Sequence, residues 1–167
     1  NFFQNYNLNS DTFKRNFTKT KIIFKSFKLD FATEIPLLES YEKNYKMNFS
    51  SKTIKKFSKY QNIIIFGMGG SVLGSKCIYS FLKNKIKNKI FFFDNLDSNL
   101  HAKFKKIKNI KSSCFVVISK SGNTLETITN LGIVFSKSLI RNKLIIITEI
   151  KNSALNSIAD KFGAEVI

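Results

Sequence analysis

Short apolar runs alternate with helix-like spacing from residue 62 to the end of the chain. The runs are rich in β-branched and aromatic side chains, which is typical of strands buried on both faces of a parallel sheet. They lie at 63–66, 90–93, 114–118 and 144–147, and a fifth begins at 166. Between them, apolar residues that recur every three or four positions predict helices at 72–82, 98–107, 125–135 and 154–161. This alternation predicts an α/β domain over residues 61–167, a three-layer αβα sandwich whose parallel sheet has the strand order 2-1-3-4-5.

The first 60 residues show a weaker pattern and predict a helical N-terminal arm. Phenylalanines and other apolar residues at helical spacing indicate helices at 11–28, 33–46 and 51–60. Ser50 or Ser51 can cap the third of these, and Ile54 and Phe57 are expected to face inward. We therefore divide the chain into an arm over residues 1–60 and a sheet domain over residues 61–167.

The run at 114–118 changes at once into a polar loop, Ser119-Lys120-Ser121-Gly122-Asn123-Thr124, which precedes the helix at 125–135. Backbone N–H groups at a helix start lack intrahelical partners, and the helix dipole favours an anion there. Hydroxyl groups, a lysine and a flexible glycine suit such a loop to a phosphate group. Capping alone is the alternative, since Asn123 followed by Glu126 resembles a capping box.

A second loop, Gly67-Met68-Gly69-Gly70-Ser71, follows the first strand. In the order 2-1-3-4-5, the first and third strands are neighbours at the point where the winding reverses, and ligands bind there at the carboxyl ends of the strands. The glycine loop and the hydroxyl loop are therefore expected to face each other.

The formal charge of +17 raises the possibility of nucleic-acid binding. However, only Arg15 and Arg141 are arginines, and the lysines are scattered over helices and turns. A solvated lysine surface accounts for this pattern, so we expect no nucleic-acid partner. No apolar run approaches the 18 or so residues of a membrane span, and we expect no membrane partner and a cytoplasmic location.

The cysteines, Cys77 and Cys114, lie within a predicted helix and a predicted strand. We expect both to be buried thiols in a reducing compartment, without a disulfide or a metal site. In the helix at 72–82, Cys77 shares one face with Leu73 and Phe81. The single histidine, His101, lies on a predicted helix away from both loops and does not indicate catalysis.

The segment Gly67-Met68-Gly69-Gly70-Ser71-Val72-Leu73-Gly74 resembles the glycine loop of the glucose-6-phosphate isomerase family. The segment Ser119-Lys120-Ser121-Gly122-Asn123-Thr124-Leu125-Glu126-Thr127 is similar to that family's phosphate loop. Their separation, and their places after the first and third strands, match the sugar isomerase (SIS) domain. The resemblance covers residues 62–167.

The resemblance implies that Ser119, Ser121 and Thr124 hold a sugar phosphate, with Lys120 and Thr127 as weaker assignments. It also implies that Gly69, Gly70 and Ser71 line the sugar. The family interconverts an aldose phosphate and a ketose phosphate through a cis-enediolate, without a metal or an organic cofactor. The whole protein is expected to act in glycolysis and gluconeogenesis as a homodimer.

The family's Gly-Gly-Arg motif is absent, and its glutamate base, ring-opening histidine and catalytic lysine are expected beyond Ile167. The sequence is therefore expected to be a piece of a longer protein, inactive alone, whose catalytic residues lie outside it.

Two other functions remain open. A non-catalytic sugar-phosphate sensor is one, because the same domain occurs in regulators. A dinucleotide-binding domain is the other, because Gly67 and Gly69 follow a strand and Asp94 ends the next one. Against the second, Val72 stands at the third glycine position of that fingerprint, and a dinucleotide site does not need the loop at Ser119.

Overall fold

The computed structural model describes residues 10–30, 40, 43–134 and 141–167, and the chain divides into two compact units, Asn1–Met47 and Asn48–Ile167. Helix α1, Ser10–Asp30, confirms the predicted helix at 11–28. The predicted helix at 33–46 lies largely outside the described residues, and residues 43–46 form a turn followed by irregular chain. No helix in the described part of the chain is long and apolar enough to cross a membrane.

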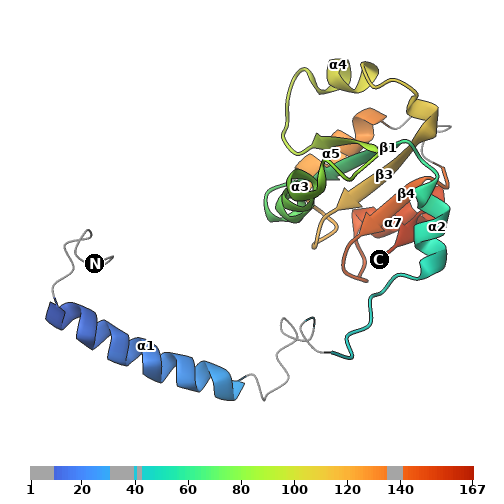
Figure 1. Ribbon diagram of the computed structural model, residues 1–167. Helices are drawn as coiled ribbons and strands as arrows, with labels where there is room; N and C mark the ends of the chain where they lie inside the picture. The colour runs from blue at the N-terminus through green and yellow to red at the C-terminus, as the bar shows by residue number, and fades with distance from the viewer. Residues whose placement is uncertain (1–9, 31–39, 41–42, 135–140) are drawn as a thin grey trace. The chain divides into compact units, whose positions relative to one another are not determined.

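The second unit contains a parallel five-stranded sheet in the order β2-β1-β3-β4-β5 (Figure 1), which confirms the predicted order. The strands are β1 (Asn62–Gly67), β2 (Lys89–Phe93), β3 (Ser113–Ile118), β4 (Leu144–Ile147) and β5 (Glu165–Val166). The helices of this unit are α2 (Ser51–Ser58), α3 (Gly70–Leu82), α4 (Leu100–Lys105), α5 (Leu125–Val134) and α7 (Ala154–Phe162), with a 3-10 turn at Ile110–Ser112.

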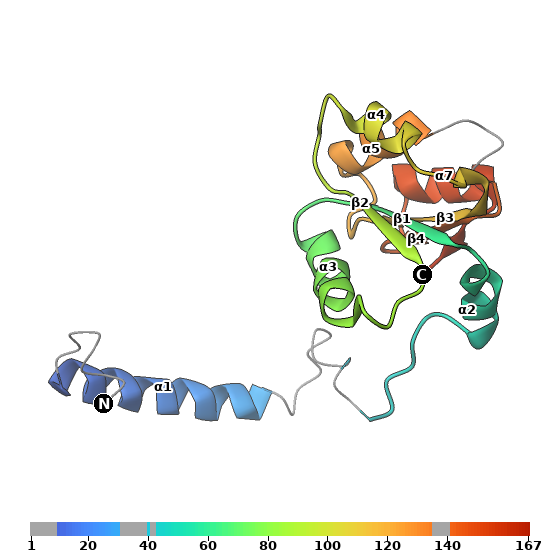
Figure 2. The same cartoon turned by 45° about the horizontal axis from the view of Figure 1, so that its top comes forward.

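The helices cover both faces of the sheet. Figure 2 shows α2 and α3 on one face and α4, α5 and α7 on the other. The placement of α3 opposite α4, α5 and α7 follows from right-handed crossovers, because the chain moves one way from β1 to β2 and the opposite way from β2 through β5. The three-layer αβα arrangement is therefore the one that the sequence predicts.

The largest part of the core lies between the sheet and the face that carries α5 and α7. Alternate strand residues are fully buried there and pack with Leu131 of α5 and Leu155 of α7; they are Ile64, Phe66, Phe115, Val117, Leu144 and Ile146. Alternation follows from the two-residue period of a strand. This packing holds the sheet rigid, and the parallel pairing of β1 with β3 places their carboxyl ends side by side.

Helix α2 belongs with the sheet unit, although the sequence groups it with the arm over residues 1–60. Thr53 Oγ1 donates to Glu165 Oε1 at 2.8 Å, and Lys56 Nζ lies 3.1 Å from Glu165 Oε2. These two contacts, the bond from Thr53 first, hold the pKa of the Glu165 carboxyl below its usual value. Phe57 is buried, as predicted, whereas Ile54 is 55% exposed and that part of the prediction is wrong.

The face of α3 that carries Leu73, Cys77 and Phe81 is not the face that lies on the sheet. Leu73 and Phe81 are 62% and 87% exposed, whereas Val72 is 1% exposed. On the sheet side of the helix, the ring of Tyr79 lies 5.9 Å from that of Phe92. Apolar residues occur around most of this helix, so their spacing indicates a helix without determining which side lies on the sheet.

The two cysteines differ, and the expectation that both are buried is wrong for Cys77. Cys114 is buried in β3, and loss of hydration there raises the pKa of its thiol to about 11. Cys77 is exposed on α3. The thiolate is the reactive form of cysteine, so the burial of Cys114 and the raised pKa of its thiol both slow its reaction.

We therefore expect a thiol reagent at pH 8 to modify one cysteine per native chain rapidly and the second only after unfolding. A count by absorbance, with the modified residue located by mass spectrometry, measures this. The Cys77→Ser variant is the control and should lose the fast phase. Rapid modification of two thiols in the native chain would contradict the burial of Cys114.

Candidate functional site

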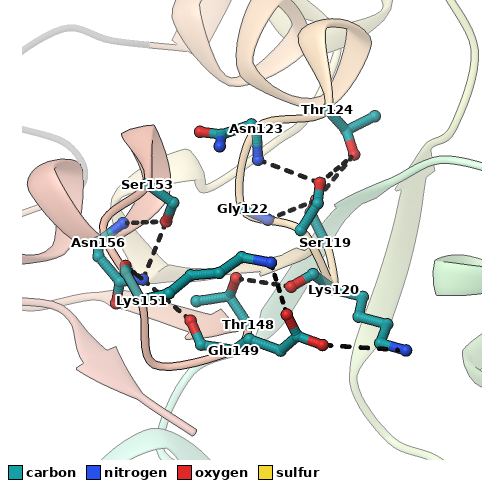
Figure 3. Close-up of polar contacts among 11 residues, drawn as sticks. Ser119, Lys120, Gly122, Asn123, Thr124, Thr148, Glu149, Lys151, Ser153 and Asn156 are labelled. Carbon is teal, nitrogen blue, oxygen red and sulfur yellow. Dashed lines mark hydrogen bonds and ion pairs between the residues drawn. The ribbon is translucent and has the colours of Figure 1, made fainter.

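The loop after β3 is organised by its own hydroxyl groups. Ser119 Oγ lies 2.8 Å from Thr124 Oγ1 and accepts a hydrogen bond from the Gly122 N–H at 3.2 Å. Ser121 Oγ lies 3.4 Å from Thr124 Oγ1 and accepts from the Asn123 N–H at 3.3 Å. Three hydroxyl groups therefore gather at the start of α5, and Figure 3 shows the contacts of Ser119 with Thr124 and Gly122.

The N-terminus of α5 is open to a ligand. The helix begins at Leu125, and the carbonyl of the preceding Thr124 accepts from the Ile128 N–H at 3.1 Å. Among the described residues, no acceptor pairs with the N–H groups of Leu125 and Glu126. Such unpaired donors, together with the helix dipole, favour an anion at this position.

The N-terminus of α7 is closed by the same loop. Asn123 Oδ1 accepts from the Ala154 N–H at 2.8 Å, and the Gly122 carbonyl accepts from the Leu155 N–H at 3.0 Å. Ser153 caps α7 through its own hydroxyl. Asn123 thus caps α7 and not the helix that follows it, so the predicted capping box within α5 is not formed. Asn123 therefore leaves the N–H groups of Leu125 and Glu126 at the start of α5 without a cap among the described residues.

The glycine loop lies beside the hydroxyl loop because β1 and β3 are neighbours, with Gly67 in register with Ile118. A recess of about 310 Å³ is lined from both loops and from the loop after β4, by Ser71, Lys120, Ser121, Thr124, Glu149 and Lys151. It adjoins a hollow of about 810 Å³ whose lining includes Met68, Gly70, Ile118 and Ile147. The predicted convergence of the two loops is therefore confirmed.

The predicted site residues take different places around these hollows. Five of them line one or both hollows: Gly70, Ser71, Lys120, Ser121 and Thr124. Ser119 is 1% exposed and lies behind Thr124, to which its hydroxyl is bonded. Gly69 precedes α3 with a φ of 52°. Thr127 is fully buried one turn into α5, and its hydroxyl has no hydrogen-bond partner among the described residues.

The sequence reasoning missed the loop between β4 and α7. Glu149 and Lys151 line the 310 Å³ recess, and Thr148 lines the larger hollow. The predicted strand order contains the signal that would have found them, because β4 is the next neighbour of β3 and its carboxyl end lies at the same edge of the sheet.

Charged groups of both signs meet at the recess. Lys151 Nζ lies 2.5 Å from Glu149 Oε2, and Lys120 Nζ lies 3.9 Å from Glu149 Oε1. The hydrogen bond from Lys151 is the main cause that lowers the pKa of the Glu149 carboxyl, and Lys120 adds a smaller effect. Glu149 is therefore ionised at neutral pH. No group of three or more metal-ligating side chains occurs among the described residues, and His101 lies exposed on α4.

Solved structures share this fold. A glucose-6-phosphate isomerase from Chlamydia trachomatis matches 77% of this chain with a TM-score of 0.60 and 21% identity, over 29% of its own length. The sugar isomerase domain of an RpiR transcription factor from Sphaerobacter thermophilus matches 69% of this chain with a TM-score of 0.51 and 16% identity, over 59% of its own length. At these identities the likeness concerns the fold alone.

Sequence comparison is more specific. The glucose-6-phosphate isomerase of Borreliella afzelii is 34% identical over 126 residues, which are 67% of this chain and 24% of that protein. The chain thus spans about a quarter of the length of the curated relative. The family model described as phosphoglucose isomerase matches residues 24–158. Since this match takes in more than half of the 167 residues, the chain belongs to the phosphoglucose isomerase family.

Proposed function

We propose that the sheet unit is the sugar-phosphate-binding portion of a glucose-6-phosphate isomerase, in which the hydroxyl loop holds the phosphoryl group. The observation that carries the proposal is the single recess lined by Ser71 of the glycine loop together with Lys120, Ser121 and Thr124 of the hydroxyl loop. The protein as a whole interconverts glucose 6-phosphate and fructose 6-phosphate, acting as a homodimer in the cytoplasm.

The chemistry of the recess supports the binding of a phosphate monoester. Hydroxyl groups and the unpaired N–H groups of α5 donate hydrogen bonds to phosphoryl oxygens, and bonds to a charged acceptor are the stronger ones. Gly70 and Ser71, with no large side chain, leave room for the sugar in the adjoining hollow of about 810 Å³. Gly69 shapes the backbone turn before α3. Thr127 is buried in the first turn of α5 and supports the hydroxyl loop from below.

The described residues bind and orient, and the proton transfer belongs to other parts of the protein. The reaction moves a proton between C1 and C2 of the sugar, far from the phosphoryl group. Binding energy from a remote group can position the reacting carbons. We therefore assign no catalytic residue within the 167 residues.

One contact argues against a dinucleotide site. Asp94, which follows β2, would have to accept hydrogen bonds from a ribose in that type of site. Its carboxylate is instead paired with the Lys76 ammonium of α3. The other alternative is a non-catalytic sugar-phosphate sensor. Such a sensor would have the same recess, but the complete protein would not convert the bound sugar phosphate.

Titration of the 167-residue chain with glucose 6-phosphate, followed by amide NMR shifts, tests the proposal. We expect millimolar binding that shifts the signals of Ser119 to Thr124, no effect of glucose at the same concentration, and no isomerase turnover in a coupled assay. Shifts caused by NAD but not by glucose 6-phosphate would favour the dinucleotide function. An isomerase of full family length that carries this segment should turn over the substrate, whereas a sensor should not.

A further inference from the structure

We propose that Lys151 is a second cation of the phosphate recess, beside Lys120. The Glu149 carboxylate pairs with the Lys151 ammonium group until a phosphoryl group displaces the carboxylate. The inference rests on the proposed function of the recess and concerns the loop between β4 and α7, which lies outside the motifs that identify the family. It makes Lys151 a ligand-binding residue and Glu149 a residue that sets affinity.

The first support is that the loop is held in place. The side-chain amide of Asn156 donates to the carbonyl of Glu149 at 3.1 Å and to that of Lys151 at 2.8 Å. The same amide lies 2.9 Å from Ser153 Oγ, at the cap of α7. The backbone on both sides of Ile150 is therefore fixed to the first turn of α7. Lys151 consequently starts from a defined position, unlike a lysine on a loose loop.

The second support is that this loop is joined to the hydroxyl loop. The Glu149 N–H donates to the Lys120 carbonyl at 3.2 Å, and Thr148 Oγ1 donates to the same carbonyl at 3.4 Å. Figure 3 shows the Lys151 side chain running from this loop into the space below Ser119 and Gly122. The ammonium group thus lies in the recess that Ser121 and the start of α5 also line.

The third support is the position of the Glu149 carboxylate. One of its oxygens lies 2.5 Å from Lys151 Nζ, and the other lies 3.9 Å from Lys120 Nζ (Figure 3). The two lysines come from different loops, so a carboxylate between them fills the place that a phosphoryl group with two charged oxygens would take. An incoming anion must therefore exchange with Glu149.

The exchange favours a dianion. Lys120 and Lys151 carry +2 and Glu149 carries −1, which leaves a net charge of +1 at the recess. A phosphate monoester with a charge near −2 gains more from the two ammonium groups than a monoanion does, because the attraction scales with the product of the charges. A carboxylate or chloride ion with a single charge gains less from the same two lysines and therefore competes less well with Glu149. The arrangement thereby selects phosphate esters over the monoanions that are abundant in solution.

The test compares four variants of the 167-residue chain by amide-shift titration with glucose 6-phosphate at low ionic strength. Lys151→Met is expected to weaken binding about three- to tenfold, and Glu149→Gln to tighten it about threefold, since the groups are partly exposed and the screening is substantial. The matched controls are Lys161→Met and Asp160→Asn on the exposed side of α7. They change the net charge equally and should leave the affinity within about twofold.

Thermal melts of the same variants separate binding from stability, and none of the four substitutions is expected to lower the midpoint by more than a few degrees. If the parent chain binds and Lys151→Met binds as tightly as Lys161→Met, the inference fails while the proposed function stands. Weaker binding by Glu149→Gln would overturn the role of Glu149 as a competitor. A parent chain in which glucose 6-phosphate shifts no loop signal overturns both the inference and the proposed function.

Discussion

Replacing Gly122 by alanine is expected to lower the melting temperature of the sheet unit by about 10 °C, at a cost of about 3 kcal/mol. Gly122 has a φ of 69°, in the left-handed region that favours glycine. An added Cβ would lie 2.3 Å from Ser153 Oγ and 2.7 Å from Ser153 Cβ. Both backbone strain and overlap therefore oppose the substitution.

The effect should spread from the loop to α7. The Gly122 carbonyl accepts from the Leu155 N–H, and Ser153 caps the same helix, so a displaced loop loses contacts at the start of α7. Calorimetry or circular dichroism measures the shift. Gly132→Ala is the matched control: it lies within α5, and an added Cβ would meet no atom of another described element within 4 Å. This control should raise stability by about 0.5–1 kcal/mol, and equal melting of both variants would contradict the close contact at Gly122.

The double substitution Ser119→Ala with Thr124→Ala is expected to weaken the binding of glucose 6-phosphate about ten- to a hundredfold. Loss of the Thr124 hydroxyl from a charged acceptor costs on the order of 1.5–3 kcal/mol, and loss of the buried Ser119 hydroxyl, which is bonded to that of Thr124, removes the contact that positions it. In an isomerase of full family length, the same change should chiefly raise KM and lower kcat by less. Thr124→Ser keeps the hydroxyl and should retain most of the affinity.

A purely structural role gives a different result. The hydroxyls of Ser119 and Thr124 are bonded to each other, and Ser119 also accepts from the Gly122 N–H, so their loss must lower the melting temperature somewhat. If the melting temperature falls and the affinity at a permissive temperature does not, the loop is only a scaffold for α5 and α7. Ser98→Ala with Thr129→Ala, two exposed positions outside the recess, is the control and should change neither quantity.

The strand pattern allowed much of the fold to be predicted because the apolar runs are short, β-branched and regularly spaced between helices. Residues 144–147, for example, are apolar at every position, which is typical of a strand with both faces covered, and Leu144–Ile147 is the strand observed. Neighbouring carboxyl ends then placed the glycine loop against the hydroxyl loop. Both features depend on local pattern and general topology, and neither requires knowledge of side-chain packing.

Other features depend on packing and could not be predicted. Leu73 and Leu125 have apolar neighbours at helical spacing, yet they are 62% and 72% exposed. The spacing cannot determine which part of a largely apolar helix lies on the sheet. Asn123 has the sequence signature of a cap for α5, but its side chain reaches the N-terminus of α7, 31 residues further along. Glu149 and Lys151 resemble ordinary turn residues until the order of the strands places them at the recess.

The position of the phosphorus atom in a crystal of the chain with glucose 6-phosphate tests the central claim most directly. We expect the phosphoryl group at the start of α5, with its oxygens about 2.5–3.0 Å from at least one of the hydroxyl oxygens of Ser121 and Thr124, and the sugar over Gly70 and Ser71. A phosphoryl group bound elsewhere would contradict the account. The clearest contradiction would be a phosphoryl group bound in the lysine-lined hollow at the opposite ends of β1 and β2, between Lys59 and Lys108, while the recess at Thr124 stays empty.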